Sequence, residues 1–138
     1  MILGVMVLSI ILDTKIAEAY KVEEVQAVVT VIEPQQIQIE ITYSEASIKK
    51  RVMEAFPNNP VMLRVVSCEG GFRADAFNPT NGSNDRGPFQ ISERSHGNRA
   101  KQLGLDLKNP VDNIAFAKIL YKESGLHPWS ASKKCWSK

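Results

Sequence analysis

The sequence predicts an α+β fold that is mainly helical, with a small β-hairpin insertion. Apolar residues recur every three or four positions in several stretches of the second half, which is the spacing of helices buried on one face. Between two of these stretches lies a segment rich in glycine, asparagine and aspartate, whose turn pairs favour short strands. The chain has 138 residues, of which 43% are hydrophobic, enough for one domain with a core. We therefore expect one folded domain with appendages.

Residues 1–19 are predicted to be a signal peptide. An apolar run from Ile2 to Leu12 precedes Ala17-Glu18-Ala19, a small-x-small pattern typical of cleavage sites. The run is shorter than the roughly 20 residues that a membrane span needs. No Lys or Arg precedes the run, so an N-terminal anchor that keeps the protein on a membrane stays an alternative. Either way, we expect a secreted or cell-envelope-associated protein.

Residues 20–43 are predicted to form an acidic spacer with strand propensity. Residues 1–43 hold two Lys or Arg and six Asp or Glu. From Ile37 to Tyr43 apolar and polar residues alternate, and a period of two is typical of a strand. The two hypotheses are a strand and a spacer that holds the following domain away from a membrane. We favour the spacer.

The folded domain is expected to span residues 44–138 and to begin with two helices. The first helix follows Ser44 as its N-cap, and its apolar residues are four positions apart, namely Ile48, Val52 and Phe56. The second helix begins with Asn59 as N-cap and Pro60 at the first helical position. It ends at Gly70 and Gly71, because glycine readily closes a helix.

Two further helices are expected after the turn-rich segment. A short one covers residues 95–103 and is closed by Gly104. The last one covers residues 110–124, with Asn109 as N-cap and Gly125 beyond its end. The predicted architecture is therefore four helices, with the segment between Asn78 and Gly87 as a small β insertion.

Two carboxylates in this domain indicate chemistry. Glu69 closes the second helix against an apolar run and near the negative end of the helix dipole, and both effects favour its protonated form. Asp85 follows sixteen positions later, in the polar turn segment, where a carboxylate stays ionised. A neutral and an ionised carboxyl form the pair that cleaves a glycosidic bond. Glu69 is therefore the candidate general acid and Asp85 its candidate partner.

The residues around this pair resemble known cell-wall enzymes. Glu69-Gly70-Gly71-Phe72, Asn78 and the run from Gly82 to Ile91 (GSNDRGPFQI) are similar to the active-site region of c-type lysozymes. The chain is also similar to soluble lytic transglycosylases and resuscitation-factor domains, which share a Glu-(Ser/Gly)-x-Phe helix end and a Gly-x-x-Gln-(Ile/Leu) element. These families share the lysozyme-like fold. The resemblance covers residues 44–138 and implies this fold for them.

The resemblance implies a muramidase, a peptidoglycan-cleaving glycosidase. Its partner would be the glycan strands of peptidoglycan, cut at the β-1,4 bond between N-acetylmuramic acid and N-acetylglucosamine. Glu69 would protonate the leaving oxygen, and Asp85 would stabilise the developing positive charge or attack the anomeric carbon. Asp85 at the c-type position favours water as the nucleophile. The alternatives are a lytic transglycosylase, which leaves 1,6-anhydro ends, and a non-catalytic peptidoglycan-binding module.

Six further residues are candidates for contact with substrate. Gln90 and three residues of the turn segment are expected to bond to the sugar and to orient Asp85, or else to satisfy the hairpin backbone; the three are Asn78, Asn81 and Ser83. Tyr121 is expected to pack in the core, with a hydrogen bond to the acid as the alternative. Trp129 is similar to a lysozyme tryptophan that packs on the catalytic glutamate and raises its pKa, and a plain core anchor is the alternative.

The resemblance has limits. The tryptophan pair with which c-type lysozymes stack sugars has no counterpart, because Ser95, His96 and Gly97 stand at its place. His96 is expected to be a solvent-exposed loop residue, with contact to an acetamido group or a phosphate as the alternative. Neither histidine has companions at metal-ligand spacing, so no metal and no cofactor is expected.

Cysteine usage and charge complete the expectations. Cys68 and Cys135 are the only two cysteines and lie behind a predicted secretion signal, so a disulfide is expected, with a pair of buried thiols as the alternative. Residues 44–138 hold fifteen Lys or Arg and nine Asp or Glu, a net charge of +6. Such a surface suits an anionic polymer. No nucleic-acid motif is present, so we expect no nucleic-acid partner, and a monomer.

Overall fold

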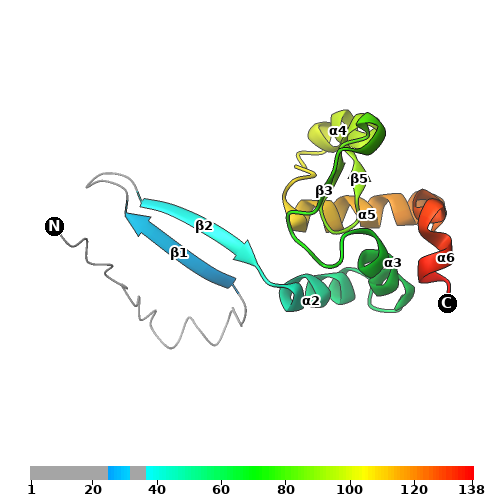
Figure 1. The fold of residues 1–138 in the computed structure, drawn as a ribbon, viewed down its shortest axis with the longest axis horizontal. Helices are drawn as coiled ribbons and strands as arrows, with labels where there is room; N and C mark the ends of the chain where they lie inside the picture. The colour runs from blue at the N-terminus through cyan, green and yellow to red at the C-terminus, as the bar shows by residue number, and fades with distance from the viewer. Residues whose placement is uncertain (1–24, 32–36) are drawn as a thin grey trace.

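The computed structural model describes residues 25–31 and 37–138, with the predicted signal peptide outside them. The fold is mixed and mainly helical, with a small three-stranded antiparallel sheet beside the helices (Figure 1). This confirms the predicted class, α+β with mainly helical content. Within the described part of the chain, no helix has the length and apolar character needed to cross a membrane.

Helices α2 (Glu45–Ala55) and α5 (Pro110–Ser124) lie where the sequence predicts them. The Ser44 hydroxyl accepts a hydrogen bond from the amide of Ser47 at 3.1 Å, so the expected N-cap of α2 is present. The Asn109 side chain caps α5 in the same way, accepting from the amide of Val111 at 2.9 Å. Both caps satisfy amides that have no partner within the helix.

Two helix starts differ from the prediction. Helix α3 spans Val61–Glu69, and Pro60 rather than Asn59 stands at the N-cap position, with no hydrogen bond from a capping side chain. Helix α4 spans Glu93–Gln102 and begins two residues before the predicted start. The reason is Ser92, whose hydroxyl caps the helix by accepting from the amide of Ser95 at 3.3 Å.

The β insertion is a three-stranded sheet and not the single hairpin that was expected. Its strands are β3 (Phe77–Asn78), β4 (Asp85–Arg86) and β5 (Ile91–Ser92), in the order β3-β4-β5. A short 3-10 turn over Thr80–Gly82 joins the first two strands. Asn78, Asp85 and Ser92 occupy paired positions, so they lie on one face of the sheet.

The core lies among α2, α3 and α5, and the C-terminal segment closes it. That segment consists of a 3-10 helix, η2 (His127–Ser132), and the short helix α6 (Lys133–Trp136), which lies beside α3 in Figure 1. The predicted disulfide is present, with Cys68 of α3 bonded to Cys135 of α6 and a Cα–Cα distance of 6.1 Å. The largest fully buried side chains include Phe89, Phe116, Ile48, Met62 and Val52.

Before the helical domain the chain forms a β-hairpin, which Figure 1 shows to one side of the helices. Strand β1 (Val25–Val31) pairs antiparallel with β2 (Ile37–Tyr43), from Val25 opposite Tyr43 to Val31 opposite Ile37. The period of two therefore corresponds to a strand, and the role of this segment as a spacer stays a prediction. Both segments are rich in Val, Ile and Thr, which favour extended pairs.

Candidate functional site

Glu69 is the last residue of α3, and Gly70 fixes where this helix end lies. The Gly70 amide donates to the carbonyl of Val66 at 3.0 Å and ends the helix. A Cβ atom on Gly70 would lie only 2.5 Å from the carbonyl oxygen of Pro88. The backbone after Glu69 therefore touches the backbone of the loop between β4 and β5. A side chain at position 70 would push the two segments apart.

The Glu69 carboxyl is half-buried, and its Oε1 lies 2.6 Å from the hydroxyl oxygen of Ser132 in η2. Burial raises the pKa of Glu69 above its ordinary value of 4.5. In the ionised form of Glu69, a hydrogen bond donated by Ser132 favours the carboxylate and lowers the pKa, whereas the negative charge of Asp85 raises it. The two carboxylates predicted from the sequence are therefore close enough to interact electrostatically.

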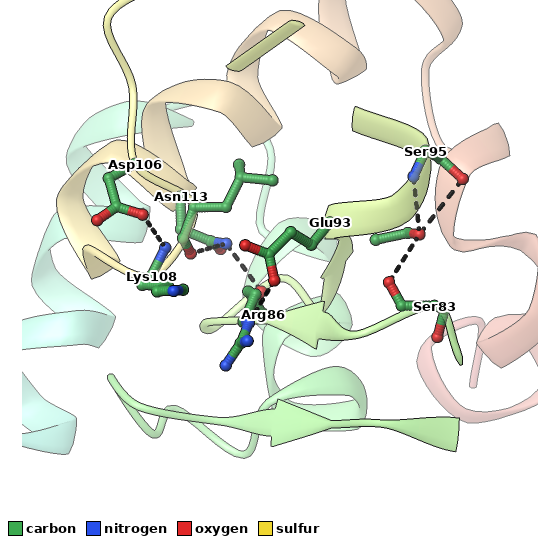
Figure 2. Close-up of polar contacts among 9 residues, drawn as sticks. Ser83, Arg86, Glu93, Ser95, Asp106, Lys108 and Asn113 are labelled. Carbon is green, nitrogen blue, oxygen red and sulfur yellow. Dashed lines mark hydrogen bonds and ion pairs between the residues drawn. The ribbon is translucent and has the colours of Figure 1, made fainter. Parts of the chain in front are cut away.

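Asp85 lies in β4 and is half-buried. Among residues 37–138, no hydrogen bond or ion pair holds its carboxylate. The neighbouring Arg86 is engaged elsewhere: its Nε lies 3.0 Å from Glu93 Oε2 (Figure 2) and its guanidinium lies 3.9 Å from the centre of the Phe77 ring. Asp85 thus keeps its oxygens available to a ligand, and the expected orienting hydrogen bonds are not seen.

Three of the predicted sugar ligands are engaged by the turn backbone. The Asn78 side-chain oxygen accepts from the Thr80 amide at 3.0 Å, and the Ser83 hydroxyl donates to the Thr80 carbonyl at 2.9 Å. Gln90 Nε2 donates to the Gly87 carbonyl at 2.9 Å. These bonds match the alternative in which such side chains satisfy the hairpin backbone. Asn81 is exposed within the 3-10 turn.

The backbone of this region is strained. In the described part of the chain, four non-glycine residues have a positive φ, between 47° and 61°, and all of them fall between positions 72 and 90. They are Phe72, Asn81, Asn84 and Gln90. Residues other than glycine rarely adopt a positive φ unless their surroundings impose it, and such residues are often found at functional sites. The strained residues thus lie in the segment that follows Glu69 and contains Asp85.

Asn113 in α5 is a site residue that is not among the candidates predicted from the sequence. Its side chain is fully buried. Nδ2 donates to the carbonyls of Arg86 at 2.8 Å and Leu107 at 3.1 Å, and Oδ1 accepts from the Phe89 amide at 3.1 Å. Figure 2 shows the side chain reaching Arg86 from the helix. Asn113 therefore attaches the loop after Asp85 to α5. The sequence feature that could have identified it is a polar amide side chain on an otherwise apolar face of the helix.

Trp129 lies in the core and not at a sugar-binding surface. It is 3% exposed, its Nε1 donates to the Phe89 carbonyl at 3.1 Å, and its ring centre lies 5.5 Å from that of Phe89. Its link to Glu69 runs through Ser132, whose hydroxyl lies 3.1 Å from the Trp129 carbonyl oxygen. The indole therefore lies in the core, and its packing on Glu69 stays a prediction.

Tyr121, Trp136 and His96 also have definite places. Tyr121 is half-buried and packs edge-on against Phe56, at 5.7 Å between ring centres. Trp136 is 6% exposed and belongs to the core. His96 is not a solvent-exposed loop residue: it lies on α4 with its ring 5.7 Å from that of Phe116, and partial burial, aided by the charge of Arg99, lowers its pKa.

A cavity of about 550 Å³ lies away from the carboxylates. It is lined by the end of β2, the loop over residues 72–75 and the start of α5. Neither Glu69 nor Asp85 lines it. We place the candidate site at the two carboxylates. The size of a cavity does not identify a reactive group, whereas Glu69 has a raised pKa and Asp85 lies among the residues with positive φ.

Within the described residues, no cluster of three or more His, Cys, Asp or Glu side chains is arranged to hold a metal ion. The arrangement can supply one carboxyl that is biased towards its acid form and one carboxylate beside it. Comparisons with models of protein families, with curated proteins and with solved structures find no match to this chain.

Proposed function

We propose that this chain is a peptidoglycan-cleaving glycosidase that acts on the β-1,4 bond between N-acetylmuramic acid and N-acetylglucosamine. The observation that carries the proposal is the half-buried Glu69, whose pKa is raised by burial and, to a smaller extent, by the negative charge of Asp85. The resemblance of the segment from Glu69 to Ile91 to lysozyme-like enzymes supports the substrate. We also propose the lysozyme-like fold for residues 44–138.

In this mechanism each carboxyl has one role. Glu69 stays protonated nearer to neutral pH than an exposed glutamate and donates its proton to the glycosidic oxygen as the bond breaks. Asp85, with no hydrogen bond to another residue of the 37–138 region, faces the positive charge that develops on the sugar ring and stabilises it. Backbone pairing within the sheet and the bond from Asn113 to the Arg86 carbonyl fix the position of β4, the strand that carries Asp85.

The surroundings of such an enzyme fit the composition of the chain. The +6 net charge of residues 44–138 attracts a polymer whose peptide stems carry carboxylates. The Cys68–Cys135 disulfide is typical of proteins outside the reducing cytosol, which supports a secreted or envelope-associated protein. These features support peptidoglycan strands as the partner. The N-terminal segment could in addition anchor the protein to a membrane.

The first test replaces the acid. Glu69→Gln keeps the shape of the side chain and removes the transferable proton, so we expect lysis of purified cell walls to fall by at least about 100-fold. Glu54→Gln, on the exposed face of α2, is the matched control and should keep full activity. Binding of each variant to sacculi, measured by co-sedimentation, should be unchanged. A lytic Glu69→Gln protein would refute the assignment, and wild-type binding without lysis would support a peptidoglycan-binding module.

A lytic transglycosylase is the second candidate, and one observation favours it. The Asp85 carboxylate lacks hydrogen bonds from the rest of the 37–138 region, and the Gln90 amide is turned to Gly87. A carboxylate that its neighbours do not orient is less effective as the second catalytic carboxylate than one that they fix in place. In a transglycosylase the C6 hydroxyl of the sugar attacks, and a single carboxyl suffices.

The product decides between the two enzymes. We expect hydrolysis, with reducing N-acetylmuramic acid ends, because Asp85 occupies the place of the second carboxylate. Mass spectrometry of the released muropeptides measures this directly, since an anhydro end is lighter by one water. We expect Asp85→Asn to lose most activity. Anhydro ends together with an active Asp85→Asn variant would establish the transglycosylase and leave Glu69 as the acid.

A further inference from the structure

The hydroxyl of Ser132 has two oxygen neighbours but only one proton. It lies 2.6 Å from Glu69 Oε1 and 3.1 Å from the carbonyl oxygen of Trp129, and both distances are in hydrogen-bond range. A carbonyl oxygen can only accept. If the Ser132 proton is directed at Trp129, the proton in the contact with Glu69 must come from Glu69.

The carbonyl of Trp129 is well placed to hold the Ser132 proton. It also accepts from Trp136 Nε1 at 2.9 Å, and a carbonyl oxygen has two lone pairs, so it can take both donors. Trp129 and Trp136 are buried, and the Cys68–Cys135 disulfide ties this segment to the helix that ends at Glu69. These groups are therefore held in fixed positions around Ser132.

The protonation state of Glu69 decides how many of these contacts are hydrogen bonds. With Glu69 protonated, Glu69 donates to Ser132 and Ser132 donates to Trp129, so both contacts are satisfied. With Glu69 ionised, the single Ser132 proton serves only one of them, and the other contact joins two oxygens with no proton between them. A polar contact left unmade in a partly buried place costs free energy.

We propose that Ser132 is a positioning residue that accepts a hydrogen bond from the acid form of Glu69 while it donates its own to the Trp129 carbonyl. Ser132 then holds the proton-bearing oxygen of Glu69 in one direction. The catalytic meaning of this role rests on the proposed function, but the hydrogen-bond arrangement does not.

Few charged groups compete with this arrangement. From the sheet, Asp85 on β4 is the charged residue that acts on Glu69, and it also favours the acid form. On the C-terminal side, Lys133 and Lys134 follow Ser132, and both are exposed to solvent. Within α3, Cys68 precedes Glu69 and is in the disulfide, and the charged Arg64 donates to the Trp136 carbonyl; Gly70 follows the helix end.

The direction of a titration shift tests the proposal. The carboxyl carbon of Glu69 can be followed by NMR against pH in the folded protein labelled with ¹³C-glutamate, with Glu69→Gln identifying the signal. If Ser132 accepts from the acid form, Ser132→Ala destabilises that form, and the titration midpoint of Glu69 moves to lower pH. If Ser132 instead donates to the carboxylate, the midpoint moves to higher pH.

Matched variants separate the hydroxyl from other effects. Ser132→Thr keeps the hydroxyl and should titrate like the wild type, whereas Ser132→Val, which has the same shape as the threonine variant, should shift like Ser132→Ala. Ser130→Ala changes an exposed serine of the same segment and should have no effect. Circular dichroism and thermal unfolding check that each variant is folded.

The activity profile gives an independent result. We expect Ser132→Ala to lose about fivefold in lysis on the alkaline side of the pH profile, the size of one ordinary hydrogen bond, and little on the acidic side. An unshifted or raised midpoint in both Ser132→Ala and Ser132→Val would overturn the proposal. A wild-type protein without lysis would refute the proposed function, and the titration would still decide the role of Ser132.

Discussion

At the scale of single residues, the position of Glu69 depends on a residue that has no side chain. Gly70 has an ordinary negative φ of −100°, so no special backbone conformation requires glycine there. What requires it is space, because the Pro88 backbone occupies the place of its Cβ. At Gly87 both reasons apply, because its φ is +68° and a Cβ would lie 2.5 Å from the buried Asn113 side chain. Two glycines thus let the helix end and the loop approach each other.

Gly70→Ala is therefore expected to destabilise the protein by about 1–3 kcal/mol, the usual cost of overpacking a buried contact. The added methyl group meets backbone atoms of Pro88, which cannot rotate away. We also expect weaker lysis, because Glu69 is displaced with the helix end. Urea unfolding monitored by tryptophan fluorescence measures the change in stability.

Gly97→Ala is the matched control. Gly97 lies inside α4, and its Cβ would meet only Glu93 Cγ at 3.3 Å, part of a flexible side chain. Because alanine favours helix over glycine, this variant should be as stable as the wild type or up to about 1 kcal/mol more stable. Equal stabilities for the two alanine variants would show that the close approach to Pro88 has no energetic consequence.

At the scale of elements, the sequence predicts best what is decided locally. The caps of α2 and α5 come from Ser44 and Asn109, which bond to amides two or three residues away. A pattern in adjacent residues contains this information. The start of α4 was misplaced because two serines, Ser92 and Ser95, are both plausible caps, and only the geometry shows which hydroxyl accepts.

The site depends on contacts that local patterns do not contain. Asn113 bonds to the backbone of Arg86 across 27 positions, and Ser132 reaches Glu69 across 63. The sequence identified the two carboxylates, because an acid at a helix end before two glycines is a local feature. It did not identify their supports. It also predicted that Trp129 packs on the catalytic glutamate, but it did not predict that the indole nitrogen donates to the Phe89 carbonyl inside the core.

At the scale of the whole molecule, the C-terminal segment packs against α3, the helix that ends at Glu69. The disulfide joins Cys68 to Cys135, and Arg64 Nε donates to the Trp136 carbonyl at 2.8 Å. Buried core residues extend from Ile48 to Trp136. Among residues 41–43, the part of β2 whose side chains the structure describes, Tyr43 is partly buried against this core and lies 5.4 Å from the Arg51 guanidinium.

This division predicts that residues 42–138 fold and act without the preceding chain. Such a protein keeps Tyr43, the α2 cap and every residue of the core, so we expect cooperative unfolding within a few degrees of the full chain's midpoint, a shift of roughly 1 kcal/mol or less for a domain of this size. Lysis of purified sacculi per mole of enzyme should also be unchanged. Scanning calorimetry and turbidity clearance measure both. The control is a chain that ends at Ser132 and therefore lacks Cys135 and Trp136. Loss of the disulfide alone should lower its free energy of unfolding by about 4 kcal/mol. Non-cooperative unfolding of residues 42–138 would show that the hairpin is part of the folding unit, whereas a stable chain ending at Ser132 would show that α6 is not.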